Sequence, residues 1–415
     1  MRILAIYKYY WPDTTPYARI LKAILEHWVA QGHEAAVLTA QPGYNDIRHP
    51  RQPWRETIGG VDVRRLRIVR ERKRSLPHRL LSFVTFLGQA IWHACTGPRP
   101  DLIIVNPHPP VLMGLTVRLI KALRGVPFIY HCQDIHPESS AAMGHIRRRW
   151  LYDLLLRVDT ASCRAAGLIV TLSDDMMATL VNRGLDRGKI VVINNFILGE
   201  EEAVAGGAPF LPSVIPGAAD AFVLLFAGNI GRFQGLEHFV HTARLLADRP
   251  DIRFLFMGEG AAKPDLQALA GELRDRTIFF CPYQPLAVAR QAMAEADLAL
   301  VSLGRGVYRV AYPSKTMMCL AAGVPVLTVV EPDSVLARDI ADNELGYGCR
   351  QGDHEATAAA IRDACDRRDR WRERRPAIVA WARANFGPEA VLARWTPLPE
   401  RLAGRGPERR AEGRA

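Results

Sequence analysis

A hydroxyl and a lysine stand at a predicted helix start, between two short apolar segments. Residues 312–316 read Tyr-Pro-Ser-Lys-Thr, and the runs at 296–303 and 324–330 have the length of buried parallel strands. A helix amino terminus presents free N–H groups and partial positive charge, which attract phosphate. Ser314, Lys315 and Thr316 therefore predict a phosphate site. A simple N-cap beside a surface cation is the alternative for this pair alone.

A glycine-rich loop in the same half of the chain strengthens that prediction. The apolar run 221–226 opens into Ala-Gly-Asn-Ile-Gly-Arg-Phe-Gln-Gly at 227–235, and an amphipathic helix follows from about 236 to 246. Glycines let a backbone turn sharply and approach a ligand closely. The spacing differs from the dinucleotide-binding fingerprint. We expect the Gly228, Asn229 and Gly231 amides and the Arg232 side chain to take the charge of a phosphate group.

Two polar residues in the first half follow another strand-like run. His131 and Asp134 come directly after Pro-Phe-Ile-Tyr at 127–130, and ligands of open α/β sheets bind at such strand ends. A hydrogen-bonded structural histidine is the alternative for His131, and an acid at a helix start is the alternative for Glu138. His131 and Asp134 are therefore both expected near a ligand site at this strand end.

The order of these motifs resembles bacterial retaining glycosyltransferases of family 4, in particular those that build exopolysaccharide, colanic-acid-like or O-antigen repeats. The resemblance runs from residue 1 to about residue 390. Its motifs are the segments 1–13, 31–39, 133–139, 226–235, 254–261, 296–301 and 313–327.

This resemblance implies a GT-B fold, in which two Rossmann-like α/β domains with parallel sheets face each other across a cleft. It implies transfer of a sugar from a nucleotide diphosphate sugar to a polyprenyl-linked acceptor, with retention at the anomeric carbon and without a metal or cofactor. The implied catalytic residues are Asp134, His131 and Glu138, of which Asp134 and His131 are expected to orient the acceptor hydroxyl or the reacting sugar. The implied donor-binding residues are Gly228, Asn229, Gly231, Arg232, Gln234, Gly258, Gly260, Ser314, Lys315 and Thr316.

The sequence departs from the family in the first loop, where Thr14-Thr15-Pro16 stand in place of the usual glycine, and at one pair of positions in the second half. The family usually carries two glutamates eight residues apart that hold the sugar and the ribose of the donor, and Val310 and Met318 stand there instead. Two other functions therefore stay open: a nucleotide-sugar epimerase of similar architecture, and a non-catalytic partner subunit that kept the fold.

Length and composition suit a two-domain protein of the cytoplasm. The 415 residues allow two or three domains, and seven scattered cysteines without a Cys-x-x-Cys pair indicate reduced thiols. Tyr7 to Asp13 interrupts the first apolar run, so a signal peptide is not expected. We predict an acceptor-side domain at 1–198, a linker at 199–220, a donor domain at 221–387, a helix returning to the first domain at 388–402, and a disordered basic tail at 403–415.

The positive charge of the chain gathers in its first half. The net charge is +11, and eleven Lys or Arg stand against three acids between Arg48 and Arg79. The apolar stretch 80–95 follows, too short to span a bilayer. A buried core helix is one reading; peripheral binding to the anionic inner face of the plasma membrane is the other, and nucleic acid is a weaker account. The expected membrane contacts are Arg72, Lys73, Arg74, Phe83, Phe86 and Trp92.

Overall fold

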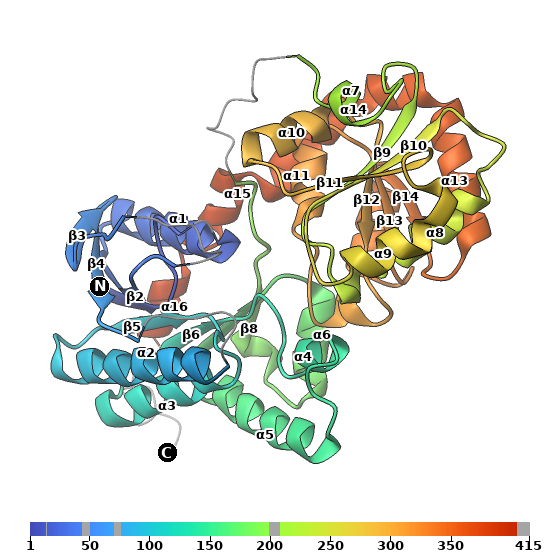
Figure 1. Ribbon diagram of the computed structural model, residues 1–415. Helices are drawn as coiled ribbons and strands as arrows, with labels where there is room; N and C mark the ends of the chain where they lie inside the picture. The colour runs from blue at the N-terminus through green and yellow to red at the C-terminus, as the bar shows by residue number, and fades with distance from the viewer. Residues whose placement is uncertain (14, 44–49, 70–75, 199–207, 405–415) are drawn as a thin grey trace. The chain divides into compact units, whose positions relative to one another are not determined.

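The computed structural model describes the whole chain except residues 14, 44–49, 70–75, 199–207 and 405–415 (Figure 1). The chain forms two compact units, one of Met1–Asn195 with Val391–Ala415 and the other of Phe196–Ala390. Each unit is an α/β domain built on a parallel sheet, which confirms the predicted fold class. The first part of the predicted linker (199–207) and nearly all of the predicted tail (405–415) lie outside the described residues.

The sheet of the first unit has eight strands in the order β3-β4-β2-β1-β5-β6-β7-β8. All neighbours pair in parallel except β3, which forms an antiparallel hairpin with β4. The strands are β1 (Arg2–Ile6), β2 (Glu34–Ala40), β3 (Arg55–Ile58), β4 (Val61–Leu66), β5 (Leu102–Val105), β6 (Phe128–His131), β7 (Leu168–Thr171) and β8 (Ile190–Val192).

Local sequence signals set the helix ends of this unit. The Thr15 hydroxyl accepts the Ala18 N–H at the start of α1, where Pro16 occupies the first turn. Gly125 ends α3 in the left-handed conformation at φ 66°. The helices are α1 (Pro16–Ala30), α2 (Leu76–Thr96), α3 (Leu112–Arg124), α4 (Glu138–Ala142), α5 (Arg149–Ala165) and α6 (Asp174–Asn182), with α16 (Leu398–Ala403) from the end of the chain.

The end of the chain packs into the first unit through Trp395, which is 1% exposed. The Trp28 indole N–H donates to the Trp395 carbonyl oxygen at 3.0 Å, and the two rings meet edge to face at 5.9 Å. The short helix α15 (Pro388–Ala393) crosses the boundary between the units. Burial of two tryptophans with a satisfied indole N–H is a stable anchor for this segment.

The second unit has a six-stranded, all-parallel sheet in the order β11-β10-β9-β12-β13-β14. Strands β9 to β13 are buried along nearly their whole length, which explains why they read as continuous apolar runs in the sequence, whereas β14 at the sheet edge is only partly buried. The strands are β9 (Phe222–Ala227), β10 (Ile252–Met257), β11 (Ile278–Cys281), β12 (Leu298–Ser302), β13 (Val326–Val329) and β14 (Gly346–Cys349). The helices are α7 (Leu211–Val214), α8 (Glu237–Arg244), α9 (Lys263–Ala270), α10 (Leu286–Glu295), α11 (Lys315–Ala321), α12 (Val335–Asp342), α13 (His354–Asp366) and α14 (Arg368–Phe386).

Candidate functional site

The loops after β9 and β10 close on each other at the carboxyl edge of the second sheet. The Ile230 N–H donates to the Glu259 carbonyl at 2.9 Å, and the Ala262 N–H donates back to the Ile230 carbonyl at 3.0 Å. Gly258, at φ +145°, makes this approach possible, because a Cβ there would lie 1.9 Å from the Gly228 carbonyl oxygen. A Cβ at Gly260 would meet the Ile230 carbonyl in the same way, at 2.2 Å. These two glycines therefore shape the loop pair.

Two of the loop amides expected to bind a diphosphate are already engaged. The Gly228 N–H donates to the Met257 carbonyl oxygen at 2.9 Å, and the Gly231 N–H donates to the Gln234 side-chain oxygen at 2.9 Å. Neither amide is left for an anion, which corrects that part of the prediction. Gln234 holds the loop from inside, since it is 8% exposed. Within the described residues, the backbone N–H of Asn229 donates to no acceptor.

Lys315 places a positive charge beside this loop. Its ammonium nitrogen is buried and lies 3.5 Å from the centre of the Phe226 ring, and a Cβ at Gly228 would stand 3.7 Å from it. No hydrogen-bond partner for Nζ occurs in the described part of the chain. Burial lowers the pKa of Lys315 to about 7. A buried cation without an anionic partner is costly, so the arrangement suits a ligand that brings negative charge.

The residues around Lys315 differ in how they are held. Ser314 is exposed, and its side chain does not cap α11. The Thr316 hydroxyl is buried and has no hydrogen-bond partner among the described residues. Arg232 is exposed and pairs with Asp265 at 3.2 Å. An exposed pair of this kind is weak, so the Arg232 side chain is available to move toward a ligand.

Apolar side chains fill the positions of the missing glutamate pair, but another carboxylate occurs at the same edge of the sheet. Val310 is 6% exposed and Met318 packs against the core of the second unit. Glu331 follows β13; one of its oxygens accepts the Gly306 N–H, and the other is buried without a partner in the described structure. The sequence prediction missed Glu331, although its place directly after a buried strand was a usable signal.

His131 is buried at the carboxyl end of β6, with both ring nitrogens in contact. Nδ1 lies 3.3 Å from the Tyr17 hydroxyl, and Nε2 lies 2.8 Å from the side-chain nitrogen of Gln133. Gln133 and Asn195 exchange two hydrogen bonds at 3.0 and 2.7 Å. Burial lowers the pKa of His131 to about 3, so the ring is neutral. These contacts favour the structural alternative for His131.

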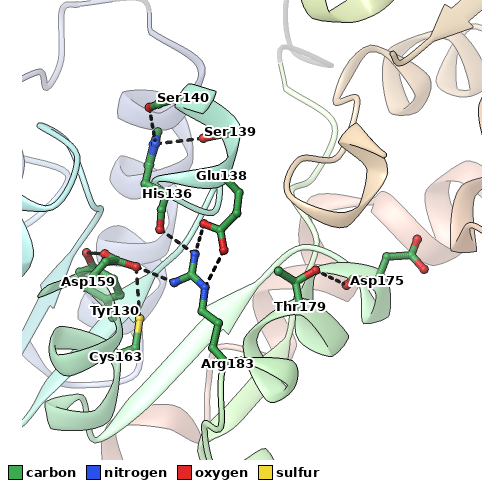
Figure 2. A network of polar contacts seen from close by, with 10 residues as sticks. All are labelled: Tyr130, His136, Glu138, Ser139, Ser140, Asp159, Cys163, Asp175, Thr179 and Arg183. Carbon is green, nitrogen blue, oxygen red and sulfur yellow. Dashed lines mark hydrogen bonds and ion pairs between the residues drawn. The ribbon is translucent and has the colours of Figure 1, made fainter. Parts of the chain in front are cut away.

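Asp134 and Glu138 lie on the segment that follows β6, and they differ in their surroundings. The Asp134 side chain is exposed, and no hydrogen bond or ion pair to it is found in the described structure. Glu138 begins α4 and pairs with Arg183, which also pairs with Asp159 (Figure 2). Asp134 is therefore the free carboxylate of this segment, whereas Glu138 is held by an internal ion cluster.

The expected membrane contacts separate into core and surface. Phe86 is 0% exposed, so its predicted membrane contact is wrong: it lies in the core of the first unit. Phe83 is half-buried and its ring lies 4.0 Å from the Lys8 ammonium. Trp92 is 66% exposed. Arg72, Lys73 and Arg74 lie outside the described residues.

Ten large apolar side chains are exposed on three neighbouring helices of the first unit, and we refer to them together as the apolar face. Helix α3 packs against α2 and α5, and these helices lie in the lower part of Figure 1. Four leucines of α3 repeat every three or four residues, as one side of a helix does. The apolar face comprises Leu80, Leu81, Val84 and Trp92 of α2, Leu112, Leu115, Leu119 and Leu123 of α3, and Trp150 and Leu154 of α5. In the part of the chain that the structure describes, no helix is long and apolar enough to cross a membrane.

Comparison with known proteins identifies both halves of the chain. Residues 17–195 match the glycosyl transferase 4-like domain, and residues 221–367 match the glycosyl transferases group 1 domain. The chain is 26% identical over 366 residues to the putative colanic acid biosynthesis glycosyl transferase WcaI of Escherichia coli K12, covering 84% of this chain and 86% of the relative. It is 28% identical over 271 residues to the probable glycosyltransferase WbjE of Pseudomonas aeruginosa, covering 65% of this chain and 67% of the relative.

Solved structures agree at the level of the fold. Sucrose-phosphate synthase from Thermosynechococcus elongatus superposes with a TM-score of 0.68 at 17% identity, covering 98% of this chain and all of that one. WaaG, a glycosyltransferase involved in lipopolysaccharide biosynthesis, superposes with a TM-score of 0.60 at 17% identity, covering 97% of this chain and 98% of that one. Anabaena Alr3699/HepE, solved in complex with UDP, superposes with a TM-score of 0.66 at 14% identity, covering 97% of this chain and 100% of that one.

Two α/β units with these domain matches define a glycosyltransferase of the GT-B fold. The chain belongs to the glycosyltransferases with a 4-like amino-terminal domain and a group 1 carboxyl-terminal domain, and the resemblance drawn from its sequence is confirmed.

Proposed function

We propose that this glycosyltransferase moves a sugar from a nucleotide diphosphate sugar to a polyprenyl-linked saccharide, with retention at the anomeric carbon, during the synthesis of a surface polysaccharide. The observation that carries the donor class is the buried Lys315 ammonium beside the Gly228 loop, which hydrogen-bonds nothing within the described residues. The curated relatives support the pathway class, since WcaI is named for colanic acid biosynthesis.

The chemistry required of the second unit is charge stabilisation on the leaving diphosphate. As the bond between the sugar and the diphosphate breaks, negative charge grows on the phosphate oxygens. Lys315, protonated when the diphosphate is bound, supplies a cation in a buried setting, where electrostatic stabilisation is stronger than in water. Arg232 and the Asn229 amide add donors from the loop after β9. Glu331 supplies a carboxylate that accepts a hydrogen bond from a donor hydroxyl, in place of the missing pair.

The chemistry required of the first unit is orientation of the acceptor. Asp134 is the exposed carboxylate of the segment after β6, and a carboxylate accepts a hydrogen bond from the attacking hydroxyl. His131 supports this segment from inside the unit through its contacts with the Tyr17 hydroxyl and the Gln133 side chain. The prediction that Asp134 faces the helix start at Ser314 across a cleft stays a prediction.

The surface of the first unit supports the proposed lipid-linked acceptor. Helix α5, which contributes to the apolar face, also carries exposed arginines: Arg147 and Arg148 stand just before it and Arg157 lies within it. Leucine and tryptophan side chains enter the headgroup region of a bilayer, and each nearby cation adds about 1 kcal/mol on an anionic leaflet. We place this face on the inner surface of the plasma membrane, where a polyprenyl-linked saccharide is presented.

Transfer across a panel of nucleotide sugars, with membrane extract as the source of acceptor, tests the proposal and identifies the donor. Proton NMR of the product then compares its anomeric configuration with that of the donor. Matching configurations support the retaining mechanism, and opposite configurations overturn it.

A further inference from the structure

Arg183 ends helix α6 and points its guanidinium into the first unit, where the side chain is 6% exposed (Figure 2). Its Nε donates to Glu138 Oε1 at 2.9 Å, and Nη2 donates to Glu138 Oε2. Nη2 also donates to the His136 carbonyl oxygen at 2.6 Å, and Nη1 donates to Asp159 Oδ2 at 2.8 Å. One arginine thus joins the segment after β6 to helices α5 and α6.

The same cluster holds the segment from its other end. The Tyr130 hydroxyl, on β6, donates to Asp159 Oδ1 at 2.9 Å. His136 is fixed further along, since its Nδ1 lies 2.9 Å from the Ser139 hydroxyl and 3.1 Å from the Ser140 hydroxyl. Asp134 lies between these two attachment points. Because its own carboxylate has no partner in the described structure, its place depends on how the backbone on either side is held.

The charges of the cluster explain why an arginine is needed. Burial disfavours the charged form of Arg183, but the carboxylates of Glu138 and Asp159 outweigh that effect and raise the pKa of the guanidinium. Burial raises the pKa of Asp159, whereas the guanidinium acts to keep this carboxylate charged. A planar fork with several N–H groups reaches two carboxylates and a carbonyl together, and a lysine ammonium does not reproduce that geometry.

We infer that Arg183 is a positioning residue that sets the place of Asp134 through Glu138, Asp159 and the His136 carbonyl. The inference rests on the proposed function, because it gives Asp134 the role of orienting the acceptor. It also assigns Glu138 to the support of the loop and leaves Asp134 as the group that meets the substrate.

The test compares Arg183→Lys with Arg64→Lys in the full-length protein. Arg64 pairs with Asp62 at 2.8 Å on β4, which is separated from β6 by three strands of the same sheet. We expect Arg183→Lys to lower kcat at least tenfold while the Kd for the nucleotide sugar changes less than twofold, since the donor residues belong to the second unit. Arg64→Lys leaves both values near wild type.

A double-mutant cycle separates positioning from general destabilisation. If Arg183 acts through Asp134, Arg183→Lys lowers kcat less than twofold in an Asp134→Asn background. A wild-type kcat in Arg183→Lys overturns the inference. So does a loss of kcat that is the same in the wild-type and Asp134→Asn backgrounds. If Arg183→Lys does not fold, Glu138→Gln takes its place in the cycle, because it removes one arm of the cluster and keeps the Arg183–Asp159 pair.

Hydrogen–deuterium exchange provides a readout that does not need turnover. The backbone amides of residues 132–136 and 138 should exchange faster in Arg183→Lys than in wild type, and their rates should not change in Arg64→Lys. Unchanged exchange across 132–138 overturns the inference even if no donor is found. A wild-type protein that transfers no sugar from any donor, with exchange altered as expected, counts against the proposed function alone.

Discussion

The ammonium of Lys315 lies 3.5 Å from the centre of the Phe226 ring, over the last strand residues before the glycine-rich loop. A cation on an aromatic face is stabilised without a hydrogen bond, so the ammonium stays available for a ligand. The Pro-Ser-Lys motif and the carboxyl end of β9 therefore meet at this contact. This relationship is the basis of the donor-site predictions.

Replacing Lys315 with methionine removes the charge and keeps most of the side-chain volume. We expect Lys315→Met to weaken nucleotide-sugar binding at least tenfold, since a charge-assisted hydrogen bond to phosphate is lost. Titration calorimetry measures the change. Lys189→Met is the matched control, because Lys189 belongs to the first unit and its ammonium donates to the Arg164 carbonyl. Equal affinity in wild type and Lys315→Met would remove Lys315 from the donor site.

Donor affinity should fall as the pH rises above 7. Burial lowers the pKa of Lys315 to about 7 in the free protein, and a bound diphosphate raises it again. Binding therefore takes up a proton above pH 7, and the Kd should increase by roughly tenfold between pH 7 and 8.5. The same titration in Lys315→Met should be nearly flat over this range. A pH-dependent Kd that survives the substitution would assign the effect to another group.

Glu331 is expected to recognise the donor rather than stabilise the fold. Glu331→Gln should raise KM for the nucleotide sugar about tenfold, because hydrogen bonds to charged groups contribute about 1.5–3 kcal/mol. The melting temperature should change little, since the glutamine oxygen can still accept the Gly306 N–H. Glu344→Gln, at an exposed ion pair of the same unit, is the control. A wild-type KM in Glu331→Gln would contradict the assignment.

The apolar face should bind anionic vesicles at low salt. Replacing Leu115, Leu119 and Leu123 with serine should reduce co-sedimentation without unfolding, because these side chains are 42–61% exposed. Salt should weaken the binding as well, since it screens the arginine contribution. Tyr283→Ser, at a residue 74% exposed on the second unit, should bind like wild type. Wild-type protein that stays in the supernatant would contradict the membrane proposal.

Phe86→Ser measures a different property of the same helix. Phe86 is fully buried, so truncation should cost about 3–5 kcal/mol of unfolding free energy, as for other buried aromatic residues. Trp92→Ser should cost little, since Trp92 is mostly exposed. Chemical denaturation of the two variants compares them directly. A similar loss in both would mean that Trp92 also belongs to the core.

The parallel sheets were predictable because strands covered on both sides read as short apolar runs between helical patterns. The sequence did not predict which apolar residues of α2 are buried and which are exposed. Phe86 and Trp92 look alike in a helix with apolar residues on most of its surface. The leucines of α3 were ambiguous as well, because the same spacing is also typical of a helix face buried in the core. Arg183 carried no local signal, since its partners lie 24 to 47 residues earlier in the chain. The hydrogen bond from the Gly231 N–H to Gln234 could not be predicted either, because it depends on the conformation of the Gln234 side chain.

The most direct test of the central claim follows a labelled sugar from its nucleotide to lipid. Wild type and Lys315→Met are incubated with nucleotide sugars labelled in the sugar and with membranes that carry polyprenyl-linked saccharide, and the solvent-extractable lipid is counted. We predict that wild type transfers label from at least one donor and that Lys315→Met transfers at least tenfold less. Conversion of the donor to its epimer with no label in lipid would instead identify an epimerase. No reaction with any donor would leave the protein as a non-catalytic partner and contradict the account.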